Sequence, residues 1–572
     1  MSVENTIIGS LAGDALTDAD FNIAIGWGAL GADTLGSKSV AIGVGALDAQ
    51  NFTTATDSFN TAVGHAAGGA VTTGTSNLLI GALAGDALTT ASHNTAVGTA
   101  ALTSDTLGSK STALGKNALA TQNFTTATDS FNVAVGHEAG LLITTGVNNT
   151  LVGAIAGDAL TDGIKNVAVG QNALGADTQG DNSVAIGSNA LCTQNGTNGN
   201  VYNTAVGANA GFSVATGYQN TLIGALSGDA LTVGIENVAL GVSSLGAAVA
   251  DARTTAIGYS ALASQVNPNF GSVVNTNNTA VGYSAGVNVT TGIQNTLIGS
   301  LAGDALQDAD FNVAVGLSAL GADTLGSKSV AVGTGALSTQ NFTTATDTFN
   351  VAIGHSAGNA VTTGIRNTCL GTNSGDFITT GRDNLTIGYE SGSYQTNLTT
   401  GDGCVLVGPY VDPTDGTADK SHGFGYNLDC AGGYTTLGDG ASDIRAAHGT
   451  ATWNTVSDER YKKDIVDSTA GLSFIKALKP RTFKYKNLGE LPETFRAYEA
   501  DSTDVFKNSN TNHGFIAQEV KAAIDADSGI KDGFKLWDER PDGSQEVGEA
   551  ALIPILVKAI QELEARVKEL EG

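Results

Sequence analysis

A five-residue motif, Asn-x-[Ala/Leu]-[Val/Ile/Leu]-Gly, recurs between residues 5 and 408, most often every 17 residues. The clear copies begin at Asn5, Asn22, Asn60, Asn77, Asn94, Asn132, Asn149, Asn166, Asn203, Asn220, Asn237, Asn278, Asn295, Asn312, Asn350, Asn367 and Asn384. Degenerate copies begin at Ser39, Ser111, Ser183, Thr254, Ser329 and Cys404, which makes 23 in total. A period this short means that no copy folds alone and that the copies must stack on one another.

Each copy has the length of one coil of a β-solenoid. The motif alternates over too few residues for a free-standing strand, but stacking pairs each strand with the copies before and after it. Glycine at the end of the motif suits a corner with positive φ. Asparagine at the other corner predicts a ladder of side-chain amides, or simply a favoured turn residue. We therefore predict a mainly β fold, with a parallel β-solenoid or β-roll rod over residues 1–408 that is about 110 Å long.

The interior positions of the predicted coil are small, as at Ala24, Ala62, Ala134 and Ala168. A thin coil buries little apolar area by itself, so we expect the neighbouring Val/Ile column to pack against other copies of the chain. Steps longer than 17 residues recur, and the pattern repeats every 72 residues in places. Identical chains can therefore pair in several wrong registers at little cost.

Composition divides the chain near residue 457. The chain holds 76 Gly and has a net charge of −28, but residues 457–572 contain only 8 of the Gly and 17 of the 27 Lys and Arg. The acidic balance argues against nucleic acid as a partner. No run of about 18 apolar residues predicts membrane insertion. The four cysteines fit neither a disulfide framework nor a zinc motif, and we expect no cofactor and no metal.

The segments NSVAIG (182–187), KSVAIG (38–43) and KSVAVG (328–333) resemble the head repeat of trimeric autotransporter adhesins. This resemblance implies a trimer of left-handed parallel β-rolls. The N-terminal sequence MSVENTIIGSLAG does not read as a signal peptide, and no C-terminal membrane barrel is visible. We therefore expect the rod architecture to carry over, and we keep a bacterial cell-surface adhesin as an alternative only.

The sequence after residue 408 predicts two further parts. Residues 409–456 form a short β-rich connector, and residues 457–572 form an α/β domain. In this domain we expect helices around 469–478 and after His513, and a long helix over 549–571. Apolar residues in the long helix recur in steps of three and four from Ile553 to Leu570, which predicts a coiled-coil seam. The alternative is an amphipathic helix packed on its own domain.

Three blocks of this domain resemble the endosialidase-type intramolecular chaperone found in phage tail spikes and tail fibres. They are Ser457-Asp458-x-Arg460-x-Lys462 followed by Asp464-Ile465, the block His513–Glu519, and the terminal AIQELEARVKEL. The resemblance implies a domain that holds three chains in register while the rod folds. It also implies that the domain then cleaves itself off between Val456 and Ser457.

Residue chemistry supports this interpretation of the first block. A serine hydroxyl needs a base, and a lysine amine serves when burial or nearby positive charge lowers its pKa. Lys462 is close enough to Ser457 for one turn to join them, and Arg460 supplies positive charge. Asp458 is expected to position Lys462 or Arg460. His513 matches a position near the site in the family, which implies an accessory role.

Other recurring residues are weaker candidates. Six Gly-Asp pairs, at Asp14, Asp86, Asp158, Asp229, Asp304 and Asp376, favour turn capping over a calcium ladder. His65, His137 and His355 share one position after the core glycine, which favours surface histidines over metal ligands. The loops 51–59, 123–131 and 341–349 carry Phe and Thr that either contact glycans or pack down on the rod.

These features together predict a trimeric phage tail fibre or virion appendage that adheres to a host surface glycan or protein receptor and contacts other tail proteins. It would be made in the host cytoplasm and act in the virion, with the chaperone domain released after cleavage. Its only predicted enzymatic activity is on its own chain, as a Ser-Lys serine endopeptidase. The alternative is a tail spike that degrades polysaccharide, which would need two acids about 5–10 Å apart in a groove.

Overall fold

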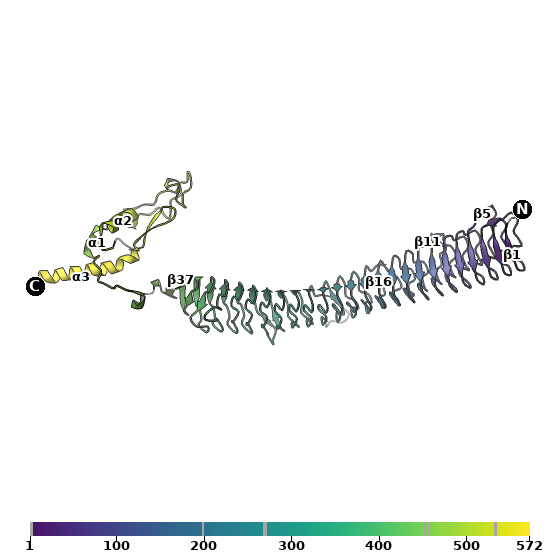
Figure 1. Cartoon of the computed structure of the whole chain (residues 1–572), viewed down its shortest axis with the longest axis horizontal. Coiled ribbons are helices and arrows are strands. Elements are labelled where there is room, and N and C mark those ends of the chain that lie inside the picture. Colours follow the sequence, from purple (N-terminus) through teal and green to yellow (C-terminus); the bar gives the residue numbers. More distant parts are fainter. Residues whose placement is uncertain are drawn as a thin grey trace. The chain divides into compact units, whose positions relative to one another are not determined.

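In the computed structural model the chain divides by its internal contacts into two units, Met1–Val456 and Ser457–Gly572. The structure describes residues 4–196, 199–266, 272–440, 442–450, 452–455, 457–530 and 535–572. The first unit is a rod of stacked coils, visible from β1 to β37 in Figure 1. Val456, on one side of the expected cleavage point, lies outside the described residues.

One three-residue strand per coil builds the principal sheet of the rod. These strands are β1 (Thr6–Ile8), β2 (Ile23–Ile25), β4 (Val40–Ile42), β6 (Thr61–Val63), β7 (Leu78–Ile80), β8 (Thr95–Val97), β10 (Thr112–Leu114), β12 (Val133–Val135), β13 (Thr150–Val152), β14 (Val167–Val169), β16 (Val184–Ile186), β18 (Thr204–Val206), β19 (Thr221–Ile223), β20 (Val238–Leu240), β22 (Thr255–Ile257), β24 (Thr279–Val281), β25 (Thr296–Ile298), β26 (Val313–Val315), β28 (Val330–Val332), β30 (Val351–Ile353), β31 (Thr368–Leu370), β32 (Leu385–Ile387) and β33 (Val405–Val407). Each pairs in parallel with the next in an unshifted register, as Thr150 does with Val167. All 23 predicted motif copies are strands, which confirms the parallel β-solenoid.

The solenoid continues past residue 408. Strand β35 (His422–Tyr426) pairs in parallel with β33, and β37 (Tyr434–Asp439) pairs in parallel with β35, which makes about 25 coils. Only then do β38 (Ser442–Ala447) and β39 (Asn454–Thr455) turn back in antiparallel order. The segment predicted as a connector thus begins with two more coils, which lack the complete motif and so escaped the repeat count.

The interior of the coil is narrow, as its small residues predict. Ala24, Ala62, Ala134 and Ala168 are all fully buried at the middle of their strands. The glycine that ends each strand has a positive φ, +141° at Gly153, and a Cβ there would lie 2.6 Å from the carbonyl carbon of Gly170 in the next coil. Both the backbone conformation and the close stacking therefore require glycine at this corner.

The asparagine corner forms a ladder, although most of its bonds join a side chain to the backbone. In one rung, the Nδ2 of Asn149 donates to the carbonyl oxygen of Gly163 at 2.8 Å. The Oδ1 of Asn149 accepts from the backbone N–H of Asn166 at 2.9 Å. Bonds between amide side chains occur as well, as from Asn220 to Asn203 at 3.2 Å. Each asparagine thus ties its own coil to its neighbours.

Longer coils carry an extra two-residue strand next to that of the preceding coil. These strands are β3 (Gly36–Ser37), β5 (Thr56–Asp57), β9 (Gly108–Ser109), β11 (Thr128–Asp129), β15 (Gly180–Asp181), β17 (Gly199–Asn200), β21 (Asp251–Ala252), β23 (Val274–Asn275), β27 (Gly326–Ser327), β29 (Thr346–Asp347), β34 (Asp412–Pro413) and β36 (Asp429–Cys430). In the loop 51–59, Phe52 is buried, whereas Phe59 is exposed with the Lys38 ammonium 5.2 Å from its ring centre. The loop therefore packs down at one end and leaves one ring on the surface.

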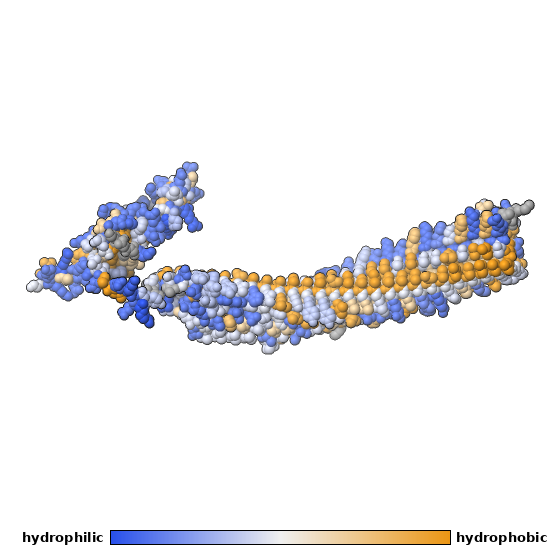
Figure 2. Space-filling model, in the orientation of Figure 1, coloured by the Kyte–Doolittle hydropathy of each residue, from blue (hydrophilic) through white to orange (hydrophobic). Residues whose placement is uncertain are grey.

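An apolar column runs along the outside of the rod. The third position of the strand is Val, Ile or Leu in each of the 23 motif coils, and its side chain points away from the buried alanine. Several are well exposed, such as Leu114 and Leu370. Figure 2 shows hydrophobic side chains as a band along the rod. A single chain leaves this band open to water.

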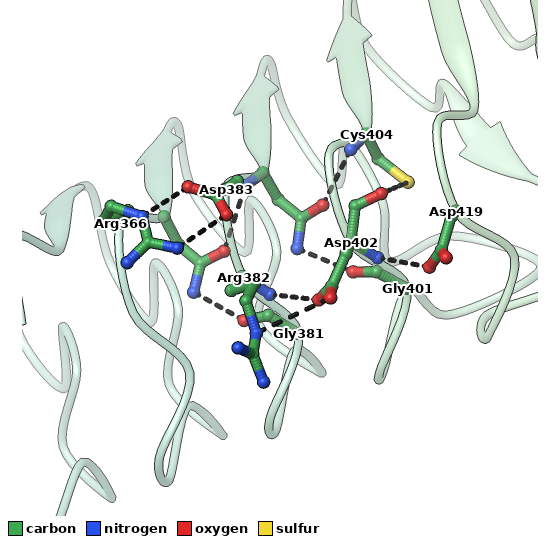
Figure 3. Close-up of polar contacts among 10 residues, drawn as sticks. Arg366, Gly381, Arg382, Asp383, Gly401, Asp402, Cys404 and Asp419 are labelled. Carbon is green, nitrogen blue, oxygen red and sulfur yellow. Dashed lines mark hydrogen bonds and ion pairs between the residues drawn. The ribbon is translucent and has the colours of Figure 1, made fainter.

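Charged side chains add bonds between coils near the end of the rod (Figure 3). The guanidinium of Arg366 bonds both carboxylate oxygens of Asp383, at 2.5 and 2.8 Å. The backbone N–H of Arg382 donates to the Asp402 carboxylate at 2.8 Å, and that of Asp402 donates to Asp419 at 2.9 Å. These exposed pairs help to align the coils and add little stability individually.

The second unit is a small α/β domain. Its elements are η1 (Glu459–Tyr461), α1 (Leu472–Ala477), β40 (Arg481–Phe483), η2 (Leu488–Glu490), β41 (Asn512–Gly514), α2 (Ala517–Ala526), β42 (Trp537–Glu539), β43 (Gln545–Val547), η3 (Glu549–Ala551) and α3 (Leu552–Glu571). Strands β40 and β41 pair antiparallel, as do β42 and β43. The core gathers Phe474, Val520, Ile524, Leu536 and Ile555. No helix in the described part of the chain is long and apolar enough to cross a membrane.

Candidate active site

A single turn at the start of the second unit brings the two predicted catalytic groups together. Asp458 is the N-cap of the short helix η1, and its carboxylate accepts a hydrogen bond from the Arg460 backbone N–H at 2.8 Å. This turn reverses the chain direction between Ser457 and Lys462. Aspartate is a preferred N-cap residue, so the turn is encoded locally.

Ser457 and Lys462 are in hydrogen-bond contact. The Nζ of Lys462 lies 2.7 Å from the Oγ of Ser457 and 3.1 Å from its carbonyl oxygen. A base at this distance can take the hydroxyl proton directly. The spacing of five residues alone predicted that a turn would join them, and the structure places the atoms in reach of each other.

Asp458 pairs with Arg460. The Arg460 guanidinium bonds the two carboxylate oxygens at 2.7 and 3.0 Å, and this lowers the pKa of Asp458. The carboxylate therefore stays charged at neutral pH. Of the two partners expected for Asp458, the structure selects Arg460, so its part in the site is to hold the turn.

His513 lies elsewhere in the domain. It belongs to β41, is exposed, and its Nδ1 is 3.5 Å from the hydroxyl of Thr482 on β40. Among the described contacts, none joins His513 to Ser457 or Lys462. The expected accessory role of His513 therefore finds no contact that would carry it in a single chain.

The site is open to solvent. Ser457, Arg460 and Lys462 are exposed, and the apolar residues that follow, Ile465 and Val466, are 68% and 84% exposed. One chain thus arranges the dyad without shielding it from water.

Two carboxylates that the sequence did not single out fix the rest of the domain. The Glu562 side chain on α3 accepts from the backbone N–H of Leu472 at 2.9 Å and so caps the start of α1. A Cβ at Gly471 would lie 2.6 Å from that carboxylate, so glycine makes room for it. Glu519 on α2 forms a two-point ion pair with Arg481 on β40. These partners are 90 and 38 residues apart, and no local pattern identifies them.

The recurring residues of the rod have structural surroundings. His65, His137 and His355 are exposed, and the carboxylate of Asp86 accepts a hydrogen bond from Thr103 in the next coil. Within the described ranges, no group of three or more His, Cys, Asp or Glu side chains is arranged to hold a metal ion.

Residues 457–528 match the family described as chaperone of endosialidase. The chain carries an endosialidase-type chaperone domain. Members of this family are self-cleaving intramolecular chaperones. The matched segment of the chaperone domain starts at Ser457 and includes Lys462 and His513, and it ends before α3. No curated protein and no solved structure matches the chain.

Proposed function

We propose that the protein is a trimeric tail fibre or similar virion appendage whose chaperone domain assembles the rod and then cuts itself off between Val456 and Ser457. The observation that carries this proposal is the 2.7 Å contact between the Oγ of Ser457 and the Nζ of Lys462. Ser457 is both the first residue of the family match and the first residue of the second contact unit. A cut there separates the rod from the chaperone without removing a coil.

The reaction is an acyl shift followed by hydrolysis. Lys462, in its neutral form, takes the hydroxyl proton while the Oγ of Ser457 attacks the carbonyl carbon of Val456. The bond between that carbon and the Ser457 nitrogen breaks, and the nitrogen receives the proton from Lys462. Water then hydrolyses the ester, which leaves a carboxylate on Val456 and a free amino group on Ser457. Asp458 supports the step by holding the turn.

Two exposed apolar features support a trimer. One is the Val/Ile/Leu column along the rod, and the other is the seam of α3, in which Ile560, Leu563 and Val567 are 63%, 46% and 49% exposed. Burying apolar surface of this extent between chains is favourable. Joining three helices first fixes the register that the repetitive rod leaves ambiguous. Contacts between chains would also shield the exposed dyad.

The rod itself is proposed to adhere to the host cell through a surface glycan or protein receptor, with other tail proteins holding it in the virion. Its coils are nearly uniform, which suits a stiff spacer better than a polysaccharide hydrolase. The chaperone domain acts only on its own chain and is released.

Expression of the wild-type chain and two variants tests the cleavage. Wild type should yield fragments 1–456 and 457–572, and the small fragment should begin at Ser457 in N-terminal sequencing. Ser457→Ala should stay whole because it lacks the nucleophile. Lys462→Met should also stay whole, whereas Lys463→Met, which removes the adjacent charge, should still be cut. A folded wild-type assembly that remains uncut would contradict the proposal.

A further inference from the structure

Four tyrosine rings meet on the surface of the last coils of the rod. Tyr410 is the central ring, and its centre lies 5.5 Å from that of Tyr389, 4.5 Å from that of Tyr394 and 5.8 Å from that of Tyr426. The rings of Tyr389 and Tyr426 stand almost at right angles to Tyr410, at 81° and 84°. Together these residues, here called the tyrosine cluster, form one aromatic surface over three successive coils.

The tyrosine cluster is exposed and rigidly held. Tyr389, Tyr394 and Tyr426 are 45%, 49% and 51% exposed. The backbone N–H of Tyr410 donates to the carbonyl oxygen of Tyr389 at 3.1 Å, which is a bond between coils. The buried Asp412 carboxylate accepts from the Tyr394 N–H at 3.1 Å and so fixes that loop. Rings held in this way lose little conformational freedom when a ligand binds.

Hydrogen-bonding groups border the rings. The exposed amide side chains of Gln395 and Asn427 directly follow Tyr394 and Tyr426 in the sequence, and each amide can both donate and accept. Glu390 bonds the Tyr389 hydroxyl, which raises the pKa of Tyr389 and keeps that hydroxyl protonated. Aromatic faces next to neutral polar groups match a sugar, whose C–H face stacks on a ring while its hydroxyls bond at the edge.

Charge and size narrow the ligand class. Residues 1–456 contain 10 Lys and Arg against 33 Asp and Glu, and Glu390 adds a negative charge beside the tyrosine cluster. This field disfavours nucleic acids and acidic polysaccharides. Four half-exposed rings present about 400 Å², compared with about 800 Å² on each side of a stable protein interface. A few sugar units fit this area better than a protein partner does.

We propose that the tyrosine cluster is a binding site for an uncharged stretch of a cell-surface polysaccharide. This inference rests on the proposed adhesive function and gives it a location and a ligand class. The rod also has a matched reference pair in Tyr259 and Tyr283, which are similarly exposed but lie face to face at 9° and 5.6 Å. In that stack each ring covers a face of the other.

Binding of the purified, assembled protein to an array of bacterial surface polysaccharides tests the site. The array includes uncharged polysaccharides and others rich in uronic or sialic acid. We expect binding to uncharged members, and about tenfold weaker binding by Tyr410→Ala and by Tyr426→Ala. Tyr283→Ala should bind as the wild type does. Tyr426→Ala keeps the result interpretable if the central ring proves necessary for folding, because Tyr426 is the most exposed of the four.

The outcomes separate this site from the adhesive function itself when attachment of the labelled protein to a panel of bacterial strains is measured in parallel. Binding of acidic polysaccharides alone, or equal losses in Tyr426→Ala and Tyr283→Ala, would overturn the site. Attachment to cells that is unchanged in Tyr426→Ala would overturn it too, while adhesion would stand. If the wild type attached to no strain and bound no polysaccharide, the adhesive function would fall with it.

Discussion

At the scale of single residues, the rod depends on corners that accept no side chain. The glycine that ends each strand combines a φ between about +128° and +145° in most coils with a carbonyl of the next coil directly above its Cα. An L-residue there meets both backbone strain and a clash with backbone atoms, which cannot move aside. The repeated glycine is therefore a packing requirement.

Substitution of one corner glycine tests this. Gly153→Ala should lower the unfolding temperature of the rod clearly, since the strained backbone alone costs about 1–3 kcal/mol. Gly45→Ala is the matched control, because a Cβ at Gly45 meets nothing within 4 Å. Thermal unfolding by circular dichroism compares the two, and equal effects would mean that close stacking does not set the requirement.

Buried acids in the rod give a second prediction. Burial raises the pKa of Asp376, and nearby Glu390 adds to the rise. Burial likewise raises the pKa of Asp105 and of Asp177. Because the folded rod then binds protons more tightly than the unfolded chain, its stability should increase as the pH falls from about 7 to about 5. Unfolding temperatures across this range check it.

Asp376→Asn isolates one contribution to this pH dependence. The variant removes a charge that the fold disfavours, so it should be more stable than wild type at about pH 7 and gain less on acidification. A wild-type unfolding temperature that decreases steadily over the same range would show that the buried acids do not govern the effect.

At the scale of elements, α3 presents two different faces. Leu552, Ile555 and Ala559 are buried, and Glu562, on the same side, caps α1. The seam that includes Ile560 and Leu563 faces elsewhere and stays exposed. The heptad pattern alone left open whether α3 packs on its own domain or on other chains. The structure separates the two sets and leaves the seam free for partners.

A charge placed in the seam tests its role. Leu563→Asp should reduce the trimer to monomers, because three buried carboxylates would face one another. Ala565→Asp adds the same charge on another side of α3 and should leave the trimer intact. Sedimentation velocity of the Ser457→Ala background, which retains α3, distinguishes them. A trimer that survives Leu563→Asp would exclude the seam as the contact.

Local patterns predicted those elements whose cause is local. The 23 motif copies became strands, and the Ser457–Lys462 contact followed from one capped turn. The two coils at β35 and β37 lack the asparagine, so only their pairing in space reveals them. The partners of His513 and Glu562 likewise depend on how distant segments pack, which spacing along the chain does not encode.

At the scale of the whole molecule, a register problem and its solution share one chain. Coils of about 17 residues are nearly interchangeable, so three chains can align wrongly at little cost. A chaperone domain at one end can align them before the rod forms, and its removal makes the assembled rod kinetically stable. The cut at the boundary between the two contact units joins these steps.

The mass of the native particle under non-denaturing conditions tests this account most directly. We predict a particle made of three copies of residues 1–456, with residues 457–572 recovered separately. The Ser457→Ala variant should instead give a particle of three full-length chains. A folded wild-type particle that contains intact chains, or a stable rod of a single chain, would contradict the account.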